Sequence, residues 1–125
     1  MNKEVQSQIY HFLKQGSYVE AEKKINDLLN KDPDNYFYQN LLAIIYVSQN
    51  KFKESIIILK KIINKEPKFI DAYINLGKIY YDLKQFKLSE NYFNKAISLN
   101  PNHSVIQFNL ANILDKQKKY DEASK

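Results

Sequence analysis

The side chains that could do chemistry in this 125-residue sequence are two histidines, 19 lysines, 14 carboxylates and ten tyrosines, without cysteine or arginine. His11 and His103 lie near opposite ends of the sequence, so we do not expect them to share an acid–base or metal site. The sequence also lacks a glycine-rich phosphate loop and a paired-carboxylate motif. We therefore predict that the chain is not an enzyme and that it holds no cofactor and no metal.

The composition indicates a helical chain. Hydrophobic residues make up 44% of the sequence, enough to bury a core, while two glycines and three prolines leave little material for turns between strands. The N-terminus lacks the apolar core of a secretory signal, and no run approaches the roughly 18 apolar residues that a membrane span needs. We expect an all-α protein in the cytoplasm.

The prolines define a repeat. Pro33, Pro67 and Pro101 stand at equal intervals (67 − 33 = 34 and 101 − 67 = 34). Because proline costs about 3 kcal/mol inside a helix and biases the preceding residue away from the helical region, each proline is expected to separate one helix pair from the next. The predicted units are residues 2–35, 36–69 and 70–103, followed by a partial fourth unit, 104–125.

The third unit carries the most specific pattern of apolar and small residues, namely Tyr73, Leu76-Gly77, Tyr80, Phe86, Ser89, Phe93, Ala96 and Pro101. In type and spacing this pattern closely resembles the tetratricopeptide repeat. The second unit follows it with Ala43 in place of the glycine. The resemblance implies a right-handed α-solenoid of antiparallel helix pairs, about 3.5 repeats in one array over residues 1–125.

The fourth unit is shorter than the others. Its second helix is expected to span only Tyr120 to Lys125, about half of the roughly 14 residues available in the other units. We infer that the chain is part of a longer protein. One alternative is the N-terminal recruiting segment of a larger enzyme, such as a glycosyltransferase or sulfotransferase, and another is self-association through the uncovered C-terminal end.

The net charge of +5 raises the question of nucleic-acid binding. A phosphate-binding surface needs positive charge gathered on one face, whereas here lysines alternate with carboxylates, as in the helical pair Glu20 and Lys24. The related pentatricopeptide fold, which reads RNA, lacks this arrangement of leucine, tyrosine and proline. We therefore expect a protein or peptide partner and no nucleic acid or membrane.

The resemblance implies a concave face, lined by the first helix of each repeat, that holds a peptide. Helical spacing and single amide contacts place twelve residues on this face: Tyr10, Phe37, Asn40, Ile44, Val47, Ile74, Asn75, Lys78, Tyr81, Phe108, Asn109 and Asn112.

Two readings of these residues remain open. Apolar members such as Ile44 could pack against neighbouring helices, since a helix inside a stack can be apolar nearly all round. As a group, they could instead form a partner site. One subclass of the family grips a C-terminal carboxylate with a lysine–asparagine pair, which is missing from every unit here. We therefore expect a non-catalytic scaffold that binds an apolar or amphipathic peptide, with an acidic group near Lys78 as a further option.

Overall fold

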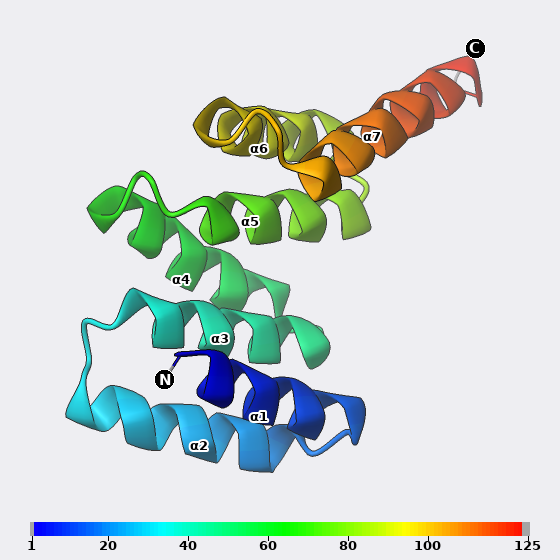
Figure 1. The fold of residues 1–125 in the computed structure, drawn as a ribbon. Helices are drawn as coiled ribbons and strands as arrows, with labels where there is room; N and C mark the ends of the chain where they lie inside the picture. Colours follow the sequence, from blue (N-terminus) through cyan, green and yellow to red (C-terminus); the bar gives the residue numbers. More distant parts are fainter. Residues whose placement is uncertain (1, 124–125) are drawn as a thin grey trace. The chain divides into compact units, whose positions relative to one another are not determined.

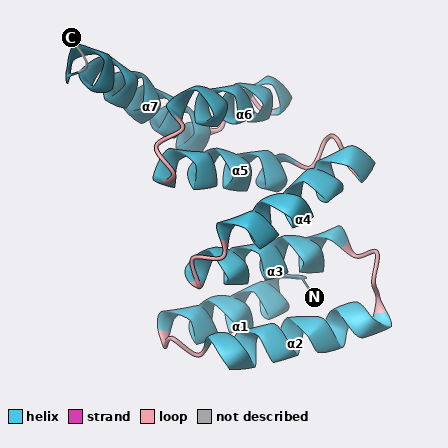
Figure 2. Ribbon diagram, turned by 180° about the vertical axis from the view of Figure 1, so that it is seen from behind, coloured by secondary structure: helices cyan, strands magenta, loops and turns pink. Residues whose placement is uncertain are grey.

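The computed structural model describes residues 2–123, and all regular structure in that range is α-helical, as Figures 1 and 2 show. The helices are α1 (Asn2–Lys14), α2 (Tyr18–Lys31), α3 (Tyr36–Ser48), α4 (Phe52–Lys65), α5 (Ile70–Asp82), α6 (Phe86–Leu99) and α7 (Ser104–Ala123). The prediction of an all-α protein is confirmed. Helices α1, α3, α5 and α7 begin at evenly spaced positions, and the spacing equals that of the prolines.

The chain divides into two compact units, residues 1–65 and residues 66–125. In the first unit α1 packs against α2 and α3, α2 packs against α3, and α3 packs against α4. A cluster of buried apolar residues joins the first three helices of this unit: Ile9, Ala21, Ile25, Leu41 and Ile45. These side chains recur at three- and four-residue steps, so one stripe of each helix faces the core.

In the second unit α6 packs against both α5 and α7. The largest fully buried side chains of the second unit come from all three of these helices: Leu76, Ile79, Phe93, Ile106 and Ile113. Helix α6 is therefore the central element of this unit, and the placement of α5 relative to α7 depends on it.

A buried hydrogen bond joins the two helices at the same repeat position in the pairs α3–α4 and α5–α6. The Ser55 hydroxyl donates to the carbonyl oxygen of Ala43 at 2.9 Å, and the Ser89 hydroxyl donates to that of Gly77 at 2.6 Å. The two bonds occupy equivalent repeat positions, so the period extends to individual contacts. Such a bond needs a small residue on the first helix, because only then does the second helix reach the backbone.

At Gly77 the second helix of the pair lies very close to the first. A Cβ atom added there would lie 2.6 Å from the nearest ring atom of Phe93, closer than real Cβ atoms come to other atoms. The equivalent positions of the first unit hold Ala43 and Leu59, both buried. The size of the small residue therefore changes with the size of its partner on the second helix. The smaller glycine is opposite phenylalanine, and the larger alanine is opposite leucine.

The connections repeat as well. The carbonyl oxygens of Pro33 and Pro101 accept hydrogen bonds from the Gln39 and Gln107 amides at 2.8 and 2.9 Å. In the same place Tyr73 donates its hydroxyl to the Pro67 carbonyl at 2.9 Å. Each proline turn is thus tied to the helix that follows it, by a side chain at the same place in every repeat.

The turns inside the helix pairs contain one residue of positive φ each. These are Gly16 (72°), Asn50 (61°) and Lys84 (61°), which again occupy equivalent repeat positions. The left-handed conformation costs a lysine about 1–2 kcal/mol, so packing of the following helix must stabilise the turn.

The fourth repeat, which begins at Ser104, differs from the predicted helix pair. Lys118 occupies the position equivalent to Lys84, yet α7 runs without a break from Ser104 to Ala123, and no second helix begins at Tyr120. Tyr120 and Ala123 stand where the third repeat has Phe86 and Ser89, yet within the described residues the helix continues past Lys118.

The Gly77–Phe93 contact leads to a stability prediction. Gly77→Ala should lower the free energy of unfolding by about 1–2 kcal/mol, because overpacking of the buried ring outweighs the roughly 1 kcal/mol gain in helix propensity. The double variant Gly77→Ala/Phe93→Leu reproduces the pair of the first unit and should recover at least half of the loss. Urea denaturation followed by circular dichroism measures both. A Gly77→Ala variant more stable than the parent would contradict the proposed contact.

Candidate functional site

A cavity of about 200 Å³ lies in the second unit, at α5, α6 and α7. We call it the Lys78 cavity. Its lining side chains are mostly polar and come from all three helices: Lys78, Tyr81, Asp82, Phe93, Asn109 and Asn112.

Helical spacing gathers these residues. Lys78, Tyr81 and Asp82 stand three and four residues apart on α5, and Asn109 and Asn112 stand three apart on α7, so each set shares one face of its helix. Phe93 belongs to α6, and its ring packs against the backbone of α5 at Gly77. The cavity therefore has polar side chains on two helices and an aromatic ring on the third.

Two donor groups of this cavity lack a partner within the described residues. The Lys78 side chain is exposed and forms no ion pair there, although the Asp82 carboxylate follows it one helical turn later. The Asn109 amide nitrogen is buried and has no hydrogen-bond acceptor. A buried donor without a partner costs about 1–3 kcal/mol, so an oxygen acceptor would remove this penalty once the Asn109 side chain turns its covered nitrogen toward the cavity.

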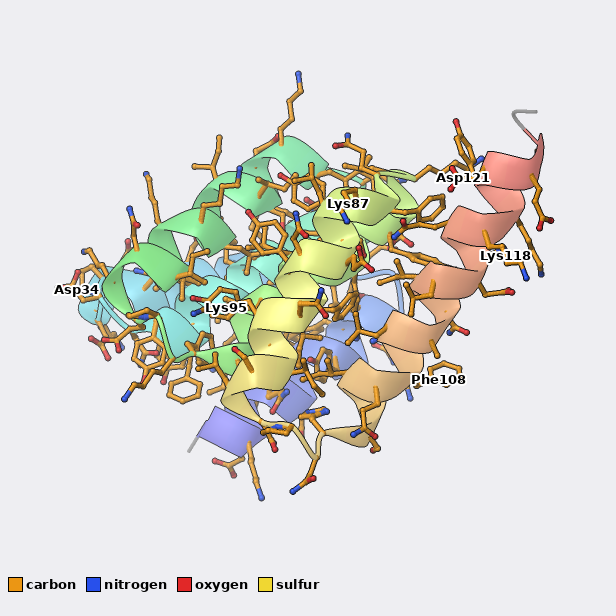
Figure 3. The ribbon with its side chains drawn as sticks, turned by 90° about the horizontal axis from the view of Figure 1, so that it is seen from above. Asp34, Lys87, Lys95, Phe108, Lys118 and Asp121 are labelled. Carbon is orange, nitrogen blue, oxygen red and sulfur yellow. The ribbon has the colours of Figure 1, made fainter. Side chains whose placement is uncertain are left out.

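Four of the seven residues predicted for the concave face in this unit line the cavity: Lys78, Tyr81, Asn109 and Asn112. The other three do not. Ile74 is buried, with 8% of its surface exposed, and Asn75 is half-buried and already engaged. Phe108 is 67% exposed and projects from the side of α7 that faces away from α6, as Figure 3 shows.

The five predicted residues of the first unit lie on α1 and α3. Tyr10 and Phe37 are each 39% exposed, and Asn40 is buried. Val47 and Ile44 are half-buried, and Ile44 packs against the buried cluster of this unit. Ile44 therefore packs against the core of this unit, and its role in binding a partner stays a prediction. Asn40 is the repeat equivalent of Ile74 and both are buried, so this position faces inward in α3 and α5.

The sequence interpretation missed Asp82 and Phe93 as lining residues. Asp82 could have been found, because it stands four residues after Lys78 and thus on the same face of α5. Phe93 was assigned to the core alone. The structure shows it in both places, since the ring that packs on Gly77 also borders the cavity.

Two tyrosines outside the Lys78 cavity have perturbed acidity. Burial raises the pKa of Tyr46, and the negative charge of Glu22 raises it further. Burial also raises the pKa of Tyr73, whose hydroxyl donates to Pro67. Both side chains stay neutral donors that join elements of the fold, which is a structural role.

Between residues 2 and 123, histidine, aspartate and glutamate side chains do not gather in any group of three that could hold a metal ion. Over the same range, the helices are too short or too polar to span a bilayer.

Comparison with sequence families identifies the repeats. Models of the tetratricopeptide repeat match residues 70–103 and residues 92–123. These matches confirm, over residues 70–123, the resemblance inferred from the sequence. No curated protein matches the sequence significantly.

Solved structures show the same fold over nearly the whole chain. The first TPR domain of human RPAP3 superposes with a TM-score of 0.82 at 19% identity, covering 98% of this chain and 96% of that domain. The Sgt2 TPR domain from Aspergillus fumigatus gives 0.83 at 17% identity, with 99% and 83% covered. The first TPR of Spaghetti (RPAP3), bound to the HSP90 peptide SRMEEVD, gives 0.78 at 19%, with 94% and 93% covered.

The unpaired amide of Asn109 leads to a second stability prediction. Asn109→Leu should raise the free energy of unfolding by about 1 kcal/mol, because it removes a buried donor without a partner. The control is Asn112→Leu, on the same helix but at an exposed position, which should change the stability by less than about 0.5 kcal/mol. Thermal and urea denaturation measure both variants. Loss of stability in Asn109→Leu would show that the amide is satisfied in the folded protein.

Proposed function

We propose that this chain is a non-catalytic binding module that holds an acidic peptide in the Lys78 cavity. The observation that carries the proposal is the pair of unpartnered donors there, the Lys78 ammonium and the buried Asn109 amide. A peptide carboxylate would pair with Lys78, and a carboxylate or carbonyl oxygen would accept from Asn109. Tyr81 and Phe93 would contact the peptide's apolar atoms.

The comparisons support a peptide as the ligand. The Spaghetti TPR domain, of the same fold, is bound to SRMEEVD, which carries two glutamates and an aspartate. Because the identity is only 19%, the mode of binding does not transfer residue by residue. In the present chain, the lysine–asparagine pair is absent from every unit, and Lys78 and Asn109 come from separate helices.

The charged groups of the Lys78 cavity determine the affinity expected for an acidic peptide. One exposed lysine contributes about 0.2–1 kcal/mol to an ion pair, and the nearby Asp82 carboxylate opposes an acidic ligand. The Asn109 amide adds more, because the free protein already bears the cost of burying it. We expect modest affinity for an acidic probe and a clear preference over the analogue in which amides replace its side-chain carboxylates.

Fluorescence polarisation with labelled SRMEEVD tests the proposal, with SRMQQVN, in which amides replace the three side-chain carboxylates, as the counterpart. SRMEEVD should bind more tightly than SRMQQVN, and Lys78→Glu should weaken it at least about fivefold, because the variant replaces attraction with repulsion. Circular dichroism should show unchanged helicity in the variant.

The matched control is Lys95→Glu, which changes the net charge equally at an exposed site of α6 that Figure 3 marks. Its affinity for SRMEEVD should equal that of the parent. Absence of binding, equal affinity for both peptides, or equal losses in Lys78→Glu and Lys95→Glu would each refute the proposed site.

A further inference from the structure

A second and larger cavity adjoins the Lys78 cavity. Its volume is about 490 Å³, and it lies in the same unit, at the C-terminal end of α5, the start of α6 and the last turns of α7. Tyr81 and Asp82 line both cavities, so the two are neighbours along α5. We call the larger one the Tyr120 cavity.

The unbroken helix α7 forms this cavity. Lys116, Lys119, Tyr120 and Ala123 all line it, and three of these four follow the point at which the earlier units turn. Together with the α7 residues of the Lys78 cavity they recur at three- and four-residue steps, so one face of α7 borders both cavities. A helix that ended before Lys118 would leave the Lys78 cavity alone.

The Tyr120 cavity has an aromatic wall. Phe86 contacts Tyr81 edge to face, with ring centroids 5.6 Å apart, and contacts Tyr120 in the same way at 6.1 Å. Tyr120 comes from α7 and is 59% exposed, so a further apolar group can reach much of its surface. Edge-to-face packing leaves ring faces accessible to such a contact.

The charges around this wall are predominantly positive. Lys84, Lys116 and Lys119 line the cavity, against one carboxylate, Asp82. Lys119 pairs with Asp115 at 3.1 Å, an exposed ion pair that adds little. Lys84 and Lys116 form no ion pair within the described residues. The complementary ligand is therefore an aromatic side chain flanked by carboxylates.

We propose that the Tyr120 cavity is a second subsite of the same peptide groove, specific for a bulky aromatic residue between acidic residues. The proposal rests on the proposed function, because the peptide that enters the Lys78 cavity continues into this one. Asn109 and Tyr120 are 11 residues apart on α7 (120 − 109 = 11), which is about 16 Å along a helix. An extended peptide rises about 3.3 Å per residue, so about five residues separate its two anchoring positions.

The experiment uses four synthetic fluorescein-labelled peptides: EEGGDFD, its alanine counterpart EEGGDAD, and the reversed pair DFDGGEE and DADGGEE. The two pairs differ in chain direction, and only the pair that matches the groove should show the effect. In that pair, the phenylalanine peptide should bind the whole chain about tenfold more tightly than its alanine counterpart, because the ring becomes partly buried. Tyr120→Ala or Lys116→Glu should reduce this ratio to about two or less. Lys118→Glu, on the side of α7 that faces away from α6 in Figure 3, should leave the ratio unchanged.

The failure of each proposal is recognisable. If Lys78→Glu weakens all bound peptides but phenylalanine gives no advantage over alanine in either direction, the Lys78 cavity stands and the second subsite is wrong. If phenylalanine helps but Tyr120→Ala leaves the advantage intact, the ring binds elsewhere and the subsite is again wrong. If none of the four peptides binds, the second subsite falls, and the SRMEEVD titration decides the proposed function separately.

Discussion

The close approach of two antiparallel helices over one small residue is the constraint on which the second unit depends. Gly77 lets the Phe93 ring lie against the backbone of α5, and there the Ser89 hydroxyl reaches the Gly77 carbonyl oxygen. Helix α6, fixed in this way, packs in turn against α7. The position of Asn109 relative to Lys78 therefore follows from a contact that involves neither residue.

Much of this fold could be predicted because its period is visible in single residues. The spacing of Pro33, Pro67 and Pro101 predicts where helix pairs begin, and the first helices of the described pairs do begin at that spacing. The helix boundary expected near Lys118 in the fourth repeat could not be predicted from this period. Lys118 has the same type and repeat position as Lys84, yet Lys118 lies inside α7, whereas Lys84 lies in a turn with positive φ.

The candidate site was only partly predictable, for a related reason. Spacing along one helix identifies a face, and it correctly grouped Lys78 with Tyr81 and Asn109 with Asn112. It does not reveal which end of that face is covered, so Ile74, one turn before Lys78, was assigned to the groove although it is buried. The single array of repeats, the cytoplasmic location, the recruiting role within a larger enzyme and the self-association stay predictions.

The central claim is that the Asn109 amide and the Lys78 ammonium bind the same acidic ligand. Its most direct test is an NMR titration of the ¹⁵N-labelled chain with SRMEEVD, in which the side-chain amide of Asn109 is followed as a separate resonance. The account predicts that this resonance and the backbone amides of Lys78 and Asn112 shift together, with one common saturation curve. Shifts confined to residues 2–65, or an Asn109 side-chain resonance unmoved at saturation, would contradict it.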